Sequence, residues 1–160
     1  MRDFGGTCIV KPSNSNHLVT LLLAGWLSPR RGLSLCLQAV TQLARRGHIT
    51  LRVAGHMDPM SGPDRKMWDE CVDRGILSAE VGFLSNEVFR AAYERSEVVR
   101  LPYDRSLNGP SGIMATAIEY GKFIVATDHG CVGYLAQTYG LGCAVSCGDR
   151  HAFKPCQRRI

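Results

Sequence analysis

The first residues that could do chemistry are two adjacent arginines, Arg30 and Arg31, which follow a short apolar segment ending at Gly25. Pro29 directly precedes them and suits the first turn of a helix, so both guanidinium groups are expected at a helix N-terminus. That end of a helix carries partial positive charge, and two cations placed there favour an anion as a third partner. The alternative is that both are ordinary solvated arginines.

A second candidate for anion binding is the turn Gly109-Pro110-Ser111-Gly112, which leads into an apolar segment. The first N–H groups of a helix have no partner inside it, and small residues let a phosphate approach them closely. The groups concerned are the amides of Ser111, Gly112, Ile113 and Met114, together with the Ser111 hydroxyl. The alternative is an ordinary loop in which Ser111 caps the helix.

The elements that would position these residues alternate between strand and helix from Val19 onward. Short apolar runs predict strands at Val19–Ala24, Ile49–Ala54, Val81–Leu84, Glu97–Leu101, Phe123–Thr127 and Cys143–Ser146. Helical spacing of apolar residues predicts helices over Leu33–Ala44, Pro63–Val72, Ser85–Tyr93, Gly112–Tyr120 and Gly133–Thr138, the first of them stopped by Gly47. Such alternation is typical of an α/β, Rossmann-like fold, with a parallel sheet and helices on both faces.

The predicted sheet would bring the two candidate anion sites to one edge. Sheets of this kind bind ligands at the carboxyl ends of their strands. The loops in question follow Gly25, Gly55, Leu101 and Thr127, each at the end of a predicted strand. A diphosphate held between Arg30 or Arg31 and the amides at Ser111–Met114 is therefore one explanation for both features.

The composition is that of a globular protein, because 45% of the 160 residues are apolar and 21% are charged. We expect a linker-like segment at residues 1–17, the Rossmann-like domain at 18–150 and an irregular tail at 151–160. The longest apolar run, Leu18–Leu27, is too short for a membrane span, and the N-terminal MRDFGGTC has no apolar core of a secretory signal. A cytoplasmic protein without a transmembrane segment is expected.

Charge and cysteine content restrict the partners further. The formal net charge of +5 is modest and the basic residues are scattered, which favours phosphate-sized anions over nucleic acid. The seven cysteines contain no Cys-x-x-Cys pair, so free thiols are expected. The cluster that could ligate zinc is Cys143, Cys147 and His151, with His129 and Cys131 upstream. A strand at Cys143 would spread these ligands apart, so no metal site is predicted.

Five segments, taken together and in order, resemble the C-terminal, nucleotide-sugar-binding domain of group 1 (family 4) glycosyltransferases. The segments are AGWLSPRRGLSLCLQAV, LRVAGHMD, VGFLSNEVFRAAYERSEVVRLPYDRS, SGIMATAIEYGKFIVATDHG and YGLGCAVSCGD. The resemblance covers about Leu18–Asp149. It implies an enzyme of two Rossmann-like domains that transfers a sugar, with retention, from a nucleotide diphosphate sugar such as a UDP or GDP donor. It implies no metal and no other cofactor.

The resemblance also implies roles for individual residues. Gly25–Leu27 matches the family's glycine-x-leucine turn, and Arg31 stands where the family has a lysine facing the diphosphate. The loops Gly55–Asp58 and Val81–Ser85 would contact the nucleobase. The expected donor-binding residues are Gly25, Trp26, Arg30, Arg31, Gly55, His56, Phe83, Leu84, Asn108, Ser111, Gly112, Ile113, Met114 and Thr116. Arg31 and Arg30 would stabilise the leaving diphosphate, and no general base is assigned.

The chain departs from the family pattern at four positions. Trp26 replaces the usual arginine after the first glycine, Asn108 and Thr116 replace two glutamates, and Tyr134 replaces a further glutamate. Loss of these carboxylates removes groups that would position the donor sugar and ribose. A second hypothesis is therefore a catalytically inactive nucleotide- or phosphate-binding module of the same fold.

The expected partners are a nucleotide diphosphate sugar and an N-terminal acceptor domain, which would be missing here or lie on another chain. The chain would be a lone or truncated domain, and joined to an acceptor domain it would be peripheral to a membrane. A third hypothesis is an unrelated doubly wound domain of the response-regulator or flavodoxin type. The segment after the first predicted strand lacks the acidic pair or Ser/Thr-rich phosphate loop that this would need.

Overall fold

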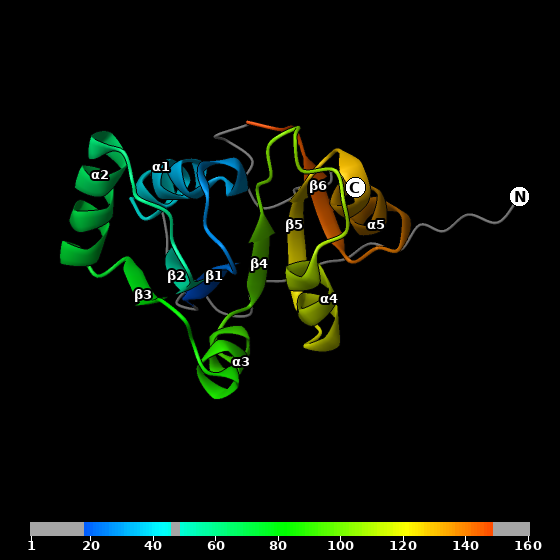
Figure 1. Ribbon diagram of the computed structural model, residues 1–160, viewed down its shortest axis with the longest axis horizontal. Helices are drawn as coiled ribbons and strands as arrows, with labels where there is room; N and C mark the ends of the chain where they lie inside the picture. Colours follow the sequence, from blue (N-terminus) through cyan, green and yellow to red (C-terminus); the bar gives the residue numbers. More distant parts are fainter. Residues whose placement is uncertain (1–17, 46–48, 149–160) are drawn as a thin grey trace, which may run out of the picture.

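In a computed structural model of the protein, which describes the placement of residues 18–45 and 49–148, the chain forms a six-stranded parallel sheet (Figure 1). The strands are β1 (Val19–Ala24), β2 (Ile49–Gly55), β3 (Leu77–Val81), β4 (Val98–Leu101), β5 (Phe123–Thr127) and β6 (Gly142–Val145). The helices are η1 (Pro29–Arg31), α1 (Leu33–Leu43), α2 (Gly62–Asp73), α3 (Asn86–Glu94), α4 (Gly112–Glu119) and α5 (Gly130–Thr138). The predicted α/β, Rossmann-like sheet is confirmed. The predicted linker at 1–17, the tail at 151–160 and the helix stop at Gly47 lie outside the described residues.

The strand order, β3-β2-β1-β4-β5-β6, places the first strand in the middle of the sheet. The chain moves outward through β2 and β3 on one side, then crosses back to β4 and moves outward through β5 and β6 on the other side. The direction of progress therefore reverses between β1 and β4. In open α/β sheets this reversal opens a crevice at the carboxyl ends of the two strands, because their following loops diverge to opposite faces.

The period of two along each strand separates the core into two layers. Leu21 and Leu23 of β1 face α1 and α2, where Leu37, Val40 and other apolar side chains are fully buried. Helices α1 and α2 lie on the same side of the sheet in Figure 1 and contact one another. Burying apolar side chains of this size contributes about 1.5–3 kcal/mol each, so these contacts fix the start of α1 relative to β1.

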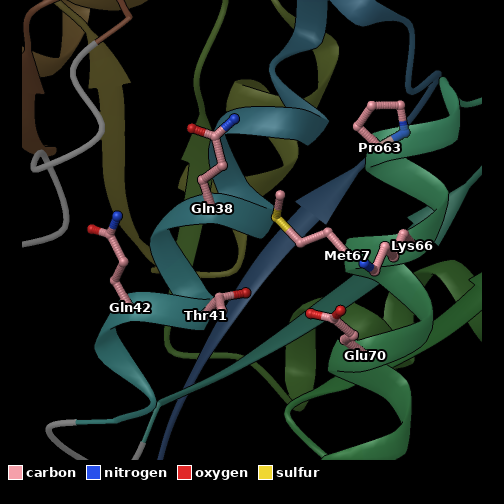
Figure 2. Close-up of a pocket in the computed structure, with 7 residues that line it drawn as sticks. All are labelled: Gln38, Thr41, Gln42, Pro63, Lys66, Met67 and Glu70. Carbon is pink, nitrogen blue, oxygen red and sulfur yellow. The ribbon is translucent and has the colours of Figure 1, made fainter.

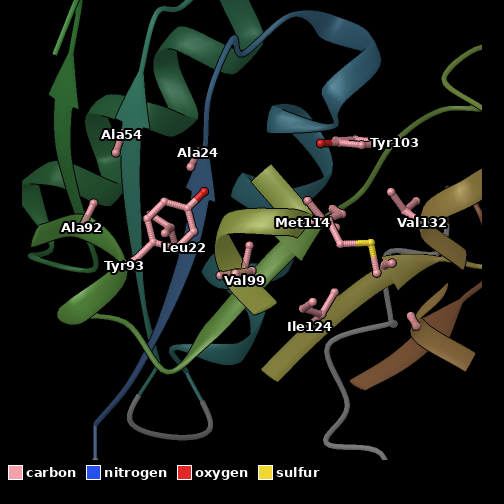
Figure 3. Close-up of a cluster of buried hydrophobic side chains, with 14 residues drawn as sticks. Leu22, Ala24, Ala54, Ala92, Tyr93, Val99, Tyr103, Met114, Ile124 and Val132 are labelled. Carbon is pink, nitrogen blue, oxygen red and sulfur yellow. The ribbon is translucent and has the colours of Figure 1, made fainter. Parts of the chain in front are cut away.

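The opposite layer packs α3, α4 and α5 against Leu22 and Ala24, the other two alternating residues of β1 (Figure 3). Tyr93 of α3 lies at the centre of this layer with no exposed surface, stacked on Tyr120 at a centroid distance of 5.6 Å. Its hydroxyl donates a hydrogen bond to the carbonyl oxygen of Ile113 at 3.4 Å. Since Ile113 belongs to the first turn of α4, this contact helps to set where α4 begins.

The predicted third strand is displaced in the structure. It was expected at Val81–Leu84 but occupies Leu77–Val81, where it pairs with Leu51–Gly55 of β2. This strand lies at the edge of the sheet and only Leu77 is buried, so it has no apolar run to mark it. Gly82, with φ of 127°, ends it. Phe83 and Leu84 therefore lie in the following loop, at the carboxyl edge.

Candidate functional site

The crevice between β1 and β4 is bordered by the loop after β1 and the loop after β4. A hollow of about 170 Å³ lies there, lined by Arg31, Tyr103, Ser106, Leu107, Asn108, Gly109, Pro110 and Ser111. Arg31 comes from the first loop and all the others from the second. The structure thus brings Arg31, Asn108 and Ser111, three of the predicted site residues, to one pocket at the point where the strand order reverses.

The loop after β1 is held close to α4 by a glycine. Gly25 has φ of 95°, and a Cβ atom added there would lie 2.8 Å from Cδ1 of Ile113. Its amide donates to the carbonyl oxygen of Ala54 at 2.9 Å, which ties this loop to the end of β2 as well. A residue with a side chain at this position would be strained by the positive φ, and the end of the Ile113 side chain would have to move to make room for it.

The expected position of the two arginines at the N-terminus of α1 is wrong. Arg30 and Arg31 form the last turn of the short 3-10 helix η1, and Gly32 separates them from α1 with φ of 74°. A Cβ atom at Gly32 would overlap the carbonyl oxygen of Pro102, so the left-handed glycine lets this turn pack against the start of the β4 loop. The guanidinium groups therefore face the crevice loops rather than the dipole of α1.

Arg31 is the better fixed of the two arginines. Its Nη1 donates to the Tyr103 hydroxyl at 3.0 Å, and its guanidinium carbon lies 5.0 Å from the centroid of the Tyr103 ring. Arg30 is exposed, and its Nη1 reaches the Ser106 hydroxyl at 3.4 Å. The two predicted cations therefore differ, with Arg31 part of the pocket wall and Arg30 at its rim.

The N-terminus of α4 forms the opposite wall. Ser111 is its N-cap residue, and its hydroxyl oxygen accepts the Met114 amide at 3.2 Å. Of the four amides predicted to face an anion, the Met114 group is therefore already paired by the cap, and the Met114 side chain lies in the core. The amides of Gly112 and Ile113 belong to the first helical turn, which leaves them without intrahelical acceptors.

A row of three rings crosses the carboxyl ends of β1, β2 and β3. The Trp26 and His56 rings meet edge to face at 4.7 Å, and the His56 and Phe83 rings lie 5.2 Å apart. Trp26 is 55% exposed and Phe83 is 93% exposed. The Trp26 indole Nε1 donates to Oδ1 of Asp58 at 2.7 Å, which fixes the ring although it faces solvent.

The row forms because the loops after β1 and β2 are joined. The Leu27 amide donates to the His56 carbonyl oxygen at 2.7 Å, and the Asp58 amide donates back to Leu27 at 3.1 Å. Gly55, with φ of 139°, lets its backbone lie against Gly25. The predicted residues Trp26, His56 and Phe83 are thus neighbours, whereas Leu84 packs against the hydrophobic layer of α3.

The two positions that carry glutamates in the resembled family lie in different surroundings. Asn108 lines the pocket and its carbonyl oxygen accepts the Cys131 amide at 2.9 Å, which joins the loop to α5. Thr116 lies one turn into α4, where its hydroxyl donates to the Gly112 carbonyl oxygen at 3.0 Å. Thr116 is not among the residues that line the pocket.

Sequence reasoning missed Tyr103 and the contacts around Asp104. His129 Nε2 lies 2.8 Å from the Asp104 carbonyl oxygen, joining the β4 loop to the start of α5. A hydrogen bond from Ser106 lowers the pKa of the Asp104 carboxyl, and the nearby Arg30 and His129 lower it further. The sequence signal for Tyr103 is its position directly after the proline that ends β4, at the reversal point.

Among residues 18–45 and 49–148, no group of three or more His, Cys, Asp and Glu side chains is arranged to hold a metal ion. Cys143, Cys147, His129 and Cys131 belong to this region, and His151 lies outside it. Burial raises the pKa of the Cys36 thiol, with Arg100 acting in the opposite direction, so this cysteine stays protonated within the core. No helix in the described part of the chain is long and apolar enough to cross a membrane.

A larger hollow, of about 470 Å³, lies between α1 and α2 (Figure 2). Gln38, Thr41 and Gln42 of α1 and Pro63, Lys66, Met67 and Glu70 of α2 line it, and Thr41 points toward α2. None of the predicted donor-binding residues lines this groove. The smaller pocket at the reversal point is therefore the better candidate, since Arg31 and the N-cap residue of α4, Ser111, both line it.

No protein-family model and no curated protein sequence matches the chain. Solved structures do share its fold. The C-terminal domain of a group 1 family glycosyl transferase, LpcC from Francisella tularensis, matches with a TM-score of 0.64 and 16% identity, covering 84% of this chain and 70% of that chain. The catalytic domain of the cholesterol-alpha-glucosyltransferase from Helicobacter pylori matches with a TM-score of 0.62 and 14% identity, covering 85% and 81%.

A third match is the HepE protein of Anabaena, whose structure is a complex with UDP and glucose. Its TM-score is 0.61 at 18% identity, over 86% of this chain and 36% of that chain. This chain therefore spans little more than a third of that longer protein. The arrangement of its sheet and helices is that of the C-terminal domain of group 1 glycosyltransferases.

Proposed function

We propose that this chain is the donor-binding half of a glycosyltransferase, and that it binds a nucleoside diphosphate sugar at the crevice between β1 and β4. The observation that carries the proposal is that Arg31 and the N-terminus of α4 form opposite walls of one pocket at the reversal point. Helix N-termini and guanidinium groups are the usual binding partners of phosphate in proteins. The shared fold with glycosyltransferase domains supports the same assignment.

In this proposal the diphosphate lies between the Arg31 guanidinium and the amides of Gly112 and Ile113. Ser111 supplies the cap that orients this turn, and Arg30 adds positive charge at the rim. Departure of a nucleoside diphosphate builds negative charge on the leaving oxygens, so fixed N–H donors and cations stabilise the transition state more than the ground state. No metal is needed for this stabilisation, because the charge is supplied by side chains and backbone.

The nucleobase is assigned to the row formed by Trp26, His56 and Phe83. The row lies at the carboxyl ends of β1 to β3, and the pocket lies at the ends of β1 and β4, so one nucleotide can reach both. Exposed rings bind a base through stacking, and each such contact contributes about 1–3 kcal/mol. Trp26 stands where the resembled family has an arginine. At this position the chain would therefore contact the nucleotide through an aromatic ring instead of a guanidinium group.

A second candidate function is a nucleotide-binding module without transferase activity. The observation that favours it is that Asn108, in the pocket, and Thr116, on α4, are uncharged. Neither can act as a carboxylate toward the donor sugar or ribose. A binding module of this kind would need neither an acceptor nor a second domain to bind one. Only the proposed transferase activity requires them.

Calorimetry measures whether the chain binds a nucleotide at all, which both candidate functions require. We expect UDP, GDP or ADP to bind the folded chain, and the parent nucleoside to bind more weakly because it lacks the diphosphate. Absence of heat with all three diphosphates would overturn both candidate functions. Hydrolysis of a UDP- or GDP-sugar, followed by release of free sugar, would favour the transferase over the binding module.

Tryptophan fluorescence tests the place of the base. The chain has two tryptophans, of which Trp26 is 55% exposed and Trp68 is 7% exposed. Stacking of a base on the row should change the emission of Trp26, and Trp26→Phe should abolish that change while Trp68 remains as an internal reference. Saturation by calorimetry with no change in emission would remove the base from this row.

A further inference from the structure

Tyr103 is the residue that joins the two walls of the pocket. It follows Pro102 at the end of β4, and only 5% of its surface is exposed. Its hydroxyl oxygen lies 3.0 Å from Nη1 of Arg31 and 2.9 Å from the hydroxyl oxygen of Ser111. Ser111 in turn accepts the Met114 amide. A single continuous set of hydrogen bonds therefore runs from the loop after β1 to the first turn of α4.

The contact on the Arg31 side restrains a side chain that is otherwise flexible. An arginine has several free torsions, and fixing them on ligand binding reduces the affinity. Here the guanidinium both donates to the Tyr103 hydroxyl and lies 5.0 Å from the centre of its ring. These contacts leave the remaining N–H donors of the planar group available to a ligand in the pocket.

The contact on the Ser111 side orients the cap of α4. The Tyr103 and Ser111 hydroxyl oxygens each already accept an N–H group, from Arg31 and Met114, and either hydroxyl can supply the proton between them. Fixing the Ser111 side chain in the capping position keeps the first turn of α4 regular. The Gly112 and Ile113 amides, which follow the pocket-lining Ser111 directly, then keep one fixed direction.

We propose that Tyr103 is a positioning residue that holds the Arg31 guanidinium and the α4 N-terminus at the spacing needed to bind a diphosphate from both sides. It adds no charge and acts through Arg31 and Ser111. This inference rests on the proposed function, since the diphosphate is the ligand that the two walls would share. A purely structural role would require only the ring, which packs in the layer shown in Figure 3.

Tyr103→Phe separates the two roles, because it keeps the buried ring and removes only the hydroxyl. The first measurement needs no ligand: the Nε–Hε signal of Arg31 in an NMR spectrum, assigned by its loss in Arg31→Lys. A restrained guanidinium gives a sharp, slowly exchanging signal, and we expect Tyr103→Phe to broaden it or speed its exchange. The matched control is Tyr139→Phe, at a tyrosine that is 65% exposed on the end of α5. An unchanged Arg31 signal in Tyr103→Phe would overturn the proposal.

The second measurement is a double-mutant cycle with inorganic pyrophosphate and UDP as probes. Losing the hydroxyl should weaken binding of both probes by about three- to tenfold, with uridine unaffected. In an Arg31→Ala background the same change should have a clearly smaller effect, because the residue acts partly through that side chain. Equal losses in both backgrounds would overturn the coupling to Arg31.

The outcomes distinguish failure of this inference from failure of the proposed function. If the unaltered chain binds neither pyrophosphate nor UDP, the proposed function fails and the positioning role falls with it, whatever the NMR signal shows about the local contact. If the chain binds both probes and Tyr103→Phe binds them equally well, only the positioning role fails. Should Tyr103→Phe not fold, Arg31→Lys takes its place: the charge remains and the stacked guanidinium is lost, so equal affinity for pyrophosphate would contradict the inference.

Discussion

At the scale of residues, the two arginines that look alike in the sequence have different surroundings. Arg31 is half-buried, stacks on Tyr103 and lines the pocket, whereas Arg30 is exposed and contacts Ser106 at 3.4 Å. A cation held by its neighbours in a partly enclosed site interacts more strongly with an anion than one in solvent does. Substituting each arginine in turn therefore shows how much a positive charge inside the pocket contributes to ligand binding, compared with one at its rim.

We expect Arg31→Ala to weaken UDP binding by at least about tenfold, because it removes a hydrogen-bonding cation next to the diphosphate. Uridine binding should change little, since the base lies on the row of Trp26, His56 and Phe83. Arg30→Ala is the control and should have a smaller effect on UDP. Titration calorimetry of both variants checks this. Equal losses for UDP and uridine in Arg31→Ala would show that Arg31 does not face the diphosphate.

At the scale of elements, glycines decide how closely the loops approach one another. Gly32 separates η1 from α1 with a left-handed backbone, and its α-carbon lies against Pro102 of the opposite loop. Gly75 has a similar φ, 68° against 74°, but no atom lies within 4 Å of a Cβ atom added there. The two glycines therefore share a left-handed backbone, which would strain any other residue, and differ in the space around them.

Substituting each glycine by alanine separates these effects. Gly75→Ala should reduce the free energy of unfolding by about 1 kcal/mol, the cost of a left-handed alanine. Gly32→Ala should reduce it by about 3 kcal/mol, because overlap with the Pro102 carbonyl is added to the same strain. Urea unfolding of both variants measures the difference. Similar losses would mean that the η1 turn moves away from the β4 loop without penalty.

The burial of Tyr93 between α3 and α4 should make the free energy of unfolding depend on pH in alkaline solution. Burial raises the pKa of the Tyr93 hydroxyl, with the Thr116 hydroxyl acting in the opposite direction. The folded chain therefore keeps this proton to higher pH than the unfolded chain. Its contribution to stability is complete below about pH 10 and is lost as the pH rises further. Tyr93→Phe should flatten this alkaline fall in urea unfolding, whereas Tyr139→Phe should leave it unchanged. An unaltered fall in Tyr93→Phe would place the titration elsewhere.

At the scale of the whole molecule, the sheet order creates the site. Reversal of the strand order between β1 and β4 turns two loops that are about 75 residues apart in the chain toward one crevice. Each wall is supported by its own hydrophobic layer, with α1 and α2 on one face and α3 to α5 on the other. The distance between the walls therefore depends on how both layers pack on the same sheet.

The net positive charge of the chain leads to a prediction about salt. The formal charge is +5, and the proposed ligand carries negative charge that Arg31 and Arg30 face near the surface. Raising the ionic strength from about 0.1 M to about 1 M shortens the screening length from about 10 Å to about 3 Å. UDP affinity should fall over this range, and uridine affinity should stay nearly constant. Calorimetry in both salt concentrations checks this, and a parallel change for the two ligands would exclude an electrostatic contact with the phosphates.

The sequence alone determined the order and type of most elements. Alternating apolar runs and helical spacing marked β1, β2, β4, β5 and the helices that follow them, because burial on both faces of a parallel sheet imposes those patterns. It also placed Arg31 and Ser111 at strand ends of the same sheet edge. It misplaced β3, whose exposed edge position requires no apolar run.

Only the tertiary structure decided the contacts across the crevice. Arg30 and Arg31 lie in η1 rather than in α1, because Gly32 separates the two helices where it packs against Pro102. Pro102 lies 70 positions later in the chain. The Tyr103 bridge and the Trp26–His56–Phe83 row likewise join segments that meet only when the sheet forms. Local patterns record which face of an element is buried, whereas the partner of a side chain across a cleft is set by the packing of all layers at once.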